Sequence, residues 1–213
     1  MSATDRLLDC TVALADSERD AKRTLTTAER AVYASLPPFR HRDWLSGRLA
    51  AKRAIAERMG ISDLDCIELR HQEGRAPIPV FVDSGGELVL PIAVSITHRE
   101  GRGAAVASAE VAGLGIDLEL QGSVTSRQSI YFLTDTEKRV AHTSGRTILW
   151  VLKEAAWKAL ACDDRTPFMD VELCFDKAGE VIGVARDGNV TPAASRVTYP
   201  WPGFVMAVVL HLE

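Results

Sequence analysis

The sequence predicts an α+β fold built from two similar α+β subdomains that are related by a pseudo-twofold axis. Two long helical segments, at about residues 42–59 and 147–160, are each flanked by short strand-like runs. Several motifs of the first half recur, in the same order, in the second half. A length of 213 residues is sufficient for two small domains. We therefore expect one subdomain over residues 1–112 and another over residues 113–213.

Composition narrows the class of protein. Hydrophobic residues make up 46% and charged residues 25% of the chain, as expected for a globular protein with a substantial core. The net charge of −4 does not favour nucleic acid, so any anion must be bound by a local basic cluster. The four cysteines form no C-x-x-C pair, which fits reduced thiols in the cytoplasm. No apolar run resembles a secretory signal or a membrane span, so we expect neither export nor a membrane partner.

The first subdomain is expected to begin with a polar lead-in of 20 residues that contains one short apolar stretch, T-V-A-L-A. Thr26 and Glu29 then have the spacing of a capping box, which predicts a helix start. A basic helix follows from about Arg42 to Met59, and its arginines form either a solvated face or part of an anion site. Short strands are predicted at residues 66–69, 80–82, 94–98 and 104–107.

The second subdomain opens on a strand at residues 113–120, G-L-G-I-D-L-E-L. Asp117 and Glu119 share one face of this strand, with their Cα atoms roughly 6–7 Å apart. Two carboxylates at this spacing repel each other in water, and a divalent cation would remove the repulsion. All-oxygen ligation suits Mg²⁺. The alternative is a polar face that is simply solvated.

The helix predicted from about Thr147 to Leu160 carries a second acidic position. Glu154 shares a face with Trp150 and Trp157, and Lys158 lies one turn beyond it. A solvated face rarely carries two tryptophans, so we expect Glu154 to point into a covered groove. Further strands are predicted at residues 171–175, 181–185, 196–199 and 204–210.

Four segments suggest an internal duplication, although chance similarity is the alternative. They pair Leu25 with Leu133, Trp44 with Trp150, Asp65 with Asp170 and Ala104 with Met206. In this alignment Arg48 falls where Glu154 falls. Packing of the copies about a pseudo-twofold axis would give a cleft with a basic and an acidic wall, which suits a polyanion held by arginines and a metal.

Taken together, these motifs resemble the 4′-phosphopantetheinyl transferase superfamily. G-I-D-L-E and W-V-L-K-E-A-A-W-K are similar to its two metal-site motifs, and R-D-W-L-S-G-R, E-G-R-A-P-I-P and S-I-T-H are similar to three others. The length and the duplication resemble the Sfp-type branch, which implies a monomeric pseudodimer. Such enzymes transfer the phosphopantetheine arm of coenzyme A to a serine of an acyl or peptidyl carrier protein and release 3′,5′-ADP.

The resemblance implies a role for each matched residue. Asp117, Glu119 and Glu154 would bind Mg²⁺, and Glu154 would also deprotonate the acceptor serine. Lys158 would contact the pyrophosphate. The phosphates of coenzyme A would be bound by Arg42, Arg75, Thr97 and His98, with His98 at the 3′-phosphate. Glu137 matches a glutamate near the metal site.

Two alternatives remain open. One is a non-catalytic member of the same fold that binds a carrier protein or coenzyme A, and the other is a metal-dependent phosphohydrolase or nuclease. The chain also departs from the family pattern in T-H-R, which adds Arg99, and in G-R-A-P, which has an extra alanine before the proline. The segment Gln121–Leu133, with Arg127, is either a carrier-protein docking rim or a loop that packs down.

Overall fold

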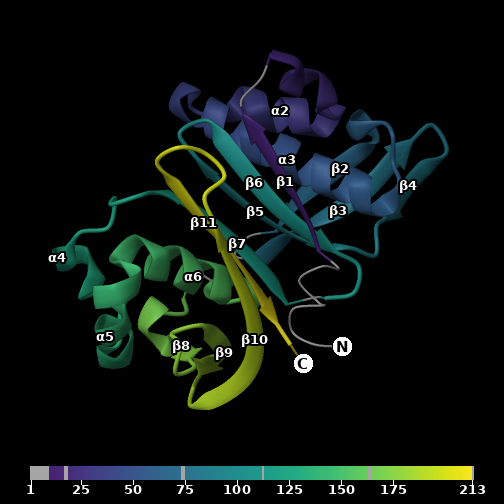
Figure 1. Ribbon diagram of the computed structural model, residues 1–213. Helices are drawn as coiled ribbons and strands as arrows, with labels where there is room; N and C mark the ends of the chain where they lie inside the picture. Colours follow the sequence, from purple (N-terminus) through teal and green to yellow (C-terminus); the bar gives the residue numbers. More distant parts are fainter. Residues whose placement is uncertain (1–9, 17–18, 73–74, 112, 163–164, 213) are drawn as a thin grey trace. The chain divides into compact units, whose positions relative to one another are not determined.

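The computed structural model describes residues 10–16, 19–72, 75–111, 113–162 and 165–212 (Figure 1). As the sequence predicts, the protein is α+β. Its residues divide into two compact units, Cys10–Ala112 and the C-terminal part from Gly113, which we call the N-terminal unit and the C-terminal unit. Each is described by itself.

The N-terminal unit contains two three-stranded antiparallel sheets, ordered β1-β6-β5 and β2-β3-β4. Helix α3 packs across β6, β1 and β5 and buries Leu45, Leu49 and Ile55. The elements are β1 (Thr11–Asp16), η1 (Arg19–Thr24), α2 (Thr27–Ser35), η2 (Pro38–Arg40), α3 (His41–Met59), η3 (Leu64–Cys66), β2 (Ile67–Gln72), β3 (Arg75–Asp83), β4 (Gly86–Val89), β5 (Ala93–Arg99) and β6 (Arg102–Ser108).

The C-terminal unit contains one five-stranded antiparallel sheet in the order β7-β11-β10-β9-β8. Figure 1 shows α6 lying against this sheet, where it packs mainly on β7 and β11. Its elements are β7 (Leu114–Leu120), α4 (Ser126–Ser129), α5 (Asp135–Ser144), α6 (Arg146–Ala159), η4 (Phe168–Asp170), β8 (Val171–Phe175), β9 (Val181–Arg186), β10 (Asn189–Thr198) and β11 (Phe204–His211).

The apolar stretch T-V-A-L-A of the predicted polar lead-in lies in a strand that the sequence did not indicate. Thr11–Asp16 forms β1, which pairs with β6 so that Ala13 lies opposite Ala105. The inward residues of β1 are Ala13 and Ala15, and two alanines give a weak apolar alternation. Tertiary pairing with β6 therefore determines this strand more than its own pattern does.

Each unit contains its own buried Glu–Lys ion pair, and the two pairs have equivalent surroundings. In the N-terminal unit Lys52 Nζ lies 2.6 Å from Glu29 Oε2, and Glu29 Oε1 accepts from the backbone N of Leu69. Glu29 and Thr26 also form the predicted capping box of α2. The carboxylate therefore joins a helix start, a long helix and a strand.

The C-terminal unit repeats this arrangement. Lys153 Nζ lies 2.6 Å from Glu137 Oε2, and both side chains are fully buried. Glu137 Oε1 accepts from the backbone N of Leu173, and Oε2 accepts from the backbone N of Thr134. The same contacts of a glutamate with a helix lysine, a capping threonine and a strand backbone N in both halves support an internal duplication on structural grounds.

The duplicated network also corrects the helix alignment. Lys52 and Lys153 occupy equivalent positions in the networks of their own units. The next residues, Arg53 and Glu154, therefore correspond to each other. The predicted equivalence of Arg48 with Glu154 is wrong. The helix ends agree, because the left-handed residues that follow α3 and α6 are Gly60, at φ 68°, and Ala161, at φ 49°. A chance similarity around the two tryptophans shifted the sequence alignment by more than one helical turn.

Strand register identifies the counterpart of the acidic strand. Asp117 pairs with Ala207 on β11, and Ala13 pairs with Ala105, the equivalent residue of β6. By the same register Ala15 corresponds to Glu119. The N-terminal unit thus carries two alanines where the C-terminal unit carries two carboxylates.

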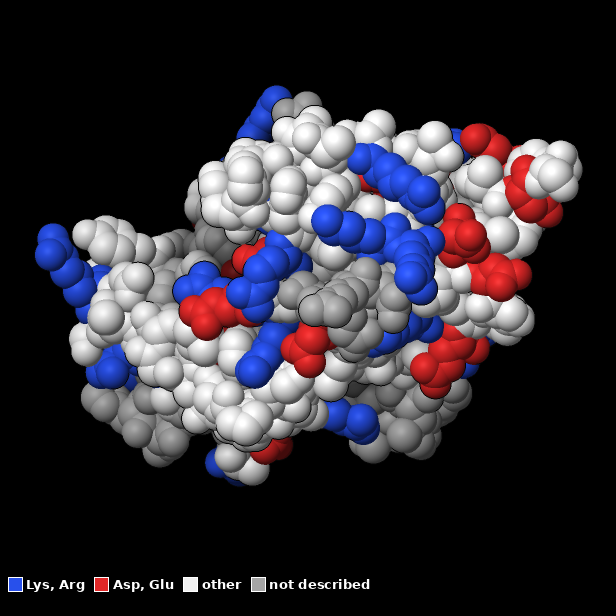
Figure 2. Space-filling model, turned by 90° about the horizontal axis from the view of Figure 1, so that it is seen from above, with Lys and Arg blue, Asp and Glu red and all other residues white. Residues whose placement is uncertain are grey.

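In the described part of the chain, no helix is long and apolar enough to cross a membrane. On the face of the molecule shown in Figure 2, the Lys and Arg side chains occur in separate groups among acidic and uncharged residues.

Candidate active site

The two acidic motifs of the C-terminal unit meet where α6 crosses β7. Lys158 Nζ on α6 lies 3.0 Å from Asp117 Oδ1 on β7 and 3.3 Å from Glu154 Oε1 on α6. It also donates to the carbonyl oxygen of Ile116 at 3.0 Å. Asp117 is buried, with 4% of its surface exposed, so its face of the strand is covered rather than solvated.

A glycine allows this close crossing of helix and strand. A methyl group at Gly115 would overlap the backbone carbonyl of Ala155 and lie 2.9 Å from the backbone N of Ala159. Contacts this short with backbone atoms cannot be relieved by side-chain movement. The glycine of G-I-D-L-E therefore lets α6 approach β7 closely enough for Lys158 to reach Asp117.

The surroundings shift the pKa values of Glu154 and Lys158. Burial raises the pKa of Glu154, and the neighbouring carboxylates of Asp117 and Glu119 raise it further, whereas Lys158 opposes them. Burial acts to lower the pKa of Lys158, but Asp117 and Glu154 outweigh that effect and raise it. Lys158 is therefore a firmly held cation.

The donor set fits Mg²⁺ in chemistry. Asp117, Glu119 and Glu154 offer only carboxylate oxygens, and their combined charge exceeds the single charge of Lys158. Glu119 Oε2 accepts weakly from Ser123 Oγ at 3.4 Å. Among the described residues, no three His, Cys, Asp or Glu side chains are already spaced as metal ligands. Here Lys158 bridges Asp117 and Glu154.

The predicted groove around Glu154 is only partly closed, because 26% of its side chain is exposed. Trp150 and Trp157 instead form an aromatic cluster. Trp150 stacks on Phe168 with ring centroids 5.2 Å apart, and Trp157 stacks on the same ring at 5.7 Å. The tryptophans therefore buttress α6.

Glu137 does not belong to the carboxylate site. Both of its oxygens are occupied by the buried network with Lys153, Thr134 and Leu173. Its place in the sequence motif reflects the shared capping box, which has a structural role in both units.

In the N-terminal unit, Arg42 and His98 approach the same turn, Glu100–Gly101. A methyl group at Gly101 would lie 2.8 Å from Arg42 Nη2, so this guanidinium rests against the turn. His98 packs on α3 at Gly47, where a methyl group would lie 3.2 Å from His98 Cδ2. The structure thus brings two of the predicted phosphate-binding residues to one place.

The other two predicted phosphate-binding residues are Thr97 and Arg75. Thr97 is buried, with 5% of its surface exposed, and precedes His98 on β5. Arg75 begins β3, and its side chain lies outside the described residues. Arg99 is exposed and pairs in register with Arg102.

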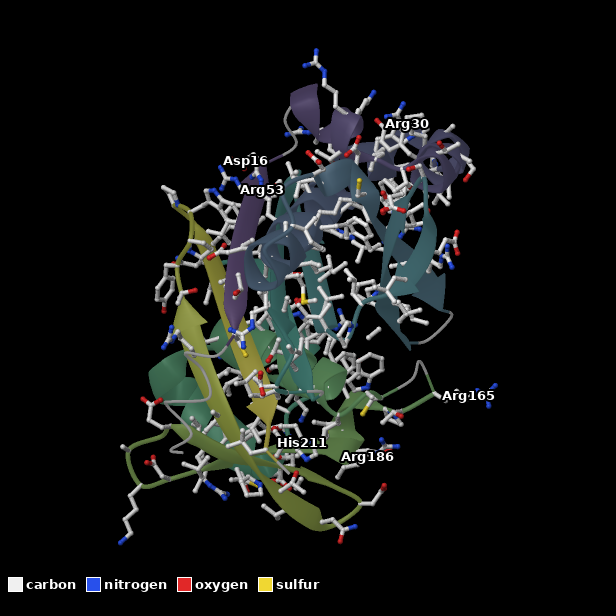
Figure 3. All side chains as sticks on the ribbon, turned by 90° about the vertical axis from the view of Figure 1, so that its right-hand side faces the viewer. Asp16, Arg30, Arg53, Arg165, Arg186 and His211 are labelled. Carbon is white, nitrogen blue, oxygen red and sulfur yellow. The ribbon has the colours of Figure 1, made fainter. Side chains whose placement is uncertain are left out.

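Two arginines of α3 donate hydrogen bonds to backbone carbonyl oxygens of their own unit. Arg48 Nη1 donates to the carbonyl oxygen of Leu69 at 2.7 Å, and its burial lowers the pKa of its guanidinium. Arg53 Nη1 donates to the carbonyl oxygen of Leu14 at 3.2 Å. Figure 3 labels Arg53 beside Asp16. Arg48 is thus held against β2 inside its own unit, and its place in a basic wall opposite Glu154 stays a prediction.

The sequence reasoning missed one basic cavity of the N-terminal unit. A cavity of about 270 Å³ is lined by Lys22, Arg23, Leu25, Arg30 and Tyr33. Lys22 Nζ lies 4.9 Å from the Tyr33 ring centre, and Arg30 Nε donates to the carbonyl oxygen of Leu25. Three of these five described lining residues carry a positive charge. The available signal was a cluster of basic residues around the α2 capping box.

No family model and no curated protein matches this chain. Among solved structures, it is similar to the holo-(acyl-carrier-protein) synthase of Thermotoga maritima, with 25% sequence identity and a TM-score of 0.39. The match covers 47% of this chain and 63% of that chain, less than two thirds of its length. A TM-score at this level supports no functional argument, so function is argued from the residues.

Proposed function

We propose that this protein is a 4′-phosphopantetheinyl transferase of the Sfp type. It would move the phosphopantetheine arm of coenzyme A to a serine of an acyl or peptidyl carrier protein. The observation that carries the proposal is the meeting of both acidic motifs, with Lys158 within 3.3 Å of Asp117 and Glu154. The family motifs thus converge on one group of side chains.

The chemistry follows from what these side chains offer. The serine Oγ attacks the phosphorus that carries the pantetheine arm, the bond from this phosphorus to the bridging oxygen breaks, and 3′,5′-ADP leaves. Glu154 accepts the serine proton, because a carboxylate within hydrogen-bond reach of the hydroxyl can act as the general base. Lys158 stabilises charge on the pyrophosphate.

Asp117, Glu119 and Glu154 would hold Mg²⁺, which supplies charge neutralisation at the pyrophosphate when bound. Asp117 is fixed on a buried strand and contacts Lys158. Its position therefore depends on the packing of β7 beneath α6 rather than on a loop.

Coenzyme A would be bound through residues of the N-terminal unit. Arg42 and His98 at the Glu100–Gly101 turn are proposed to bind phosphate, with His98 at the 3′-phosphate. Thr97 and Arg75 complete the proposed set. The basic cavity at Arg30 is a further candidate for a phosphate, because three cationic side chains line it.

The proposed protein partner is an apo carrier protein, which presents its serine beside acidic residues. We propose that Arg127, Ile130 and Tyr131 form part of its docking surface. Ile130 and Tyr131 are 61% and 73% exposed, whereas the next residue, Phe132, is buried. We further propose that the chain acts as a cytoplasmic monomer.

One assay separates this function from its alternatives. The protein is incubated with coenzyme A, Mg²⁺ and an apo carrier protein, and the intact mass of the carrier is measured. A mass increase of one phosphopantetheine supports the proposal. An unmodified carrier that nevertheless binds the protein indicates a non-catalytic member of the fold. Hydrolysis of coenzyme A without carrier modification indicates a phosphohydrolase.

A further inference from the structure

We propose that Asp43 is a positioning residue for the 3′-phosphate of coenzyme A. It would hold the Glu100–Gly101 turn and, through this turn, Arg42 and His98. The identity of the ligand rests on the proposed function, whereas the role of Asp43 rests on the geometry of the turn.

The turn has a backbone that its sequence disfavours. Arg99 and Arg102 are the last paired residues of β5 and β6, and only Glu100 and Gly101 lie between them. Their φ angles are 51° and 76°, as in a two-residue type I′ hairpin turn. Asn, Asp or Gly normally occupies the first position, and glutamate there carries strain. Such strain persists where surrounding contacts hold the backbone.

Asp43 supplies those contacts from the first turn of α3. Its Oδ1 accepts a hydrogen bond from the backbone N of Gly101. Its Oδ2 lies 3.9 Å from His98 Nδ1. One carboxylate therefore contacts both the turn and the imidazole, and this leaves His98 Nε2 as the ring nitrogen on the side away from Asp43.

Because Gly101 has no side chain, the guanidinium of Arg42 can lie directly against the turn. A methyl group at Gly101 would lie 2.8 Å from Nη2, 3.0 Å from Nε and 3.1 Å from Cζ of Arg42. The guanidinium therefore lies along the turn. A shift of the turn would remove the surface on which the guanidinium rests, and this contact couples Asp43 to Arg42.

A second turn in the chain provides a matched control. Asp187 and Gly188 join β9 to β10 with φ angles of 52° and 76°. A methyl group at Gly188 would meet no atom within 4 Å. Alanine at Gly188 thus adds the same backbone strain as alanine at Gly101, but displaces no basic side chain.

The experiment compares Michaelis constants for coenzyme A and for dephospho-coenzyme A, which lacks the 3′-phosphate. Loss of a hydrogen bond to a charged group should raise the constant of Asp43→Ala for coenzyme A about tenfold, with that for dephospho-coenzyme A nearly unchanged. Asp43→Asn keeps an acceptor for Gly101 and should restore most of the loss. Melting temperatures establish that each variant is folded.

The glycine pair gives a second, independent test. Gly101→Ala should reproduce the selective effect of Asp43→Ala, whereas Gly188→Ala should leave both Michaelis constants unchanged. Equal effects on the two substrates, or no effect of Asp43→Ala on either, would overturn the positioning role. If the wild-type protein transfers nothing from either substrate, the proposed function fails and the inference falls with it. An active wild-type protein with an unselective Asp43→Ala variant overturns the inference alone.

Discussion

Gly115 determines whether the carboxylate site can form. A methyl group there would overlap the carbonyl of Ala155, so Gly115→Ala must push α6 away from β7. We expect the free energy of unfolding to fall by about 3 kcal/mol, the upper end for overpacking, and transfer to be lost because Lys158 no longer reaches Asp117. Chemical denaturation and the carrier mass assay measure the two effects.

The matched control for this prediction is Gly85→Ala. The one neighbour of a methyl group at Gly85 is Asp83 Oδ1, at 3.2 Å on a flexible side chain. Stability and transfer should both stay near the wild-type values. A Gly115→Ala protein with wild-type stability and activity would show that α6 does not need this close approach.

Lys158 lies between two carboxylates, and removing it exposes their repulsion. Lys158→Met removes the cation beside Asp117, whose side chain is 5% exposed. In the absence of metal, this should lower the free energy of unfolding by about 3 kcal/mol. Mg²⁺ should then raise the melting temperature of the variant more than that of the wild type. Calorimetry with and without Mg²⁺ measures this difference. No Mg²⁺ effect on either protein would contradict the metal assignment.

At the scale of elements, the buried Glu–Lys pairs tie each long helix to its unit. Lys153→Met strands Glu137 in a fully buried position and should lower the free energy of unfolding by about 3–5 kcal/mol. The double variant Lys153→Met/Glu137→Leu should recover a large part of this loss, because no lone charge remains. Urea denaturation of the full double-mutant cycle gives the coupling energy.

The equivalent double-mutant cycle at Lys52 and Glu29 serves as the comparison, since that pair is buried in the equivalent network of the N-terminal unit. Similar coupling energies are expected in both units. A negligible coupling in either unit would contradict the shared structural role of these pairs.

These elements show what the sequence could and could not predict. The capping box of α2 was readable, because Thr26 and Glu29 satisfy a local spacing rule. The partners Lys52 and Lys153 were not, because a buried lysine at a helical position looks like a solvated one. The contact of Arg48 with β2 was not predictable for the same reason: its backbone acceptor at Leu69 lies far away in sequence.

The docking segment is divided between surface and core. Phe132 and Leu133 are buried, whereas Ile130 and Tyr131 are exposed beside the short helix that carries Arg127. Arg127→Glu should raise the Michaelis constant for an acidic carrier protein and leave that for coenzyme A unchanged, with a smaller difference at high salt. Steady-state kinetics at two salt concentrations test this. Equal changes for both substrates would remove the segment from the interface.

At the scale of the whole chain, the two copies have diverged in charge on one scaffold. The C-terminal copy has Asp117 and Glu119 on its strand and Glu154 on its helix, whereas the N-terminal copy has Ala13, Ala15 and Arg53 in the equivalent places. The sequence predicted the carboxylate site because its two motifs are local. It did not predict the alanine counterpart, which only strand register identifies.

Asp117, Glu119, Glu154 and Lys158 are proposed to form one metal-dependent transfer site. The most direct measurement is the intact mass of an apo carrier protein after incubation with coenzyme A and Mg²⁺, with wild type, Glu154→Gln and Gly85→Ala run in parallel. The carrier should gain one phosphopantetheine with the wild type and with Gly85→Ala, in proportion to the 3′,5′-ADP released. It should gain none with folded Glu154→Gln or with the wild type in excess chelator. Full modification of the carrier by Glu154→Gln, or in excess chelator, would contradict the claim.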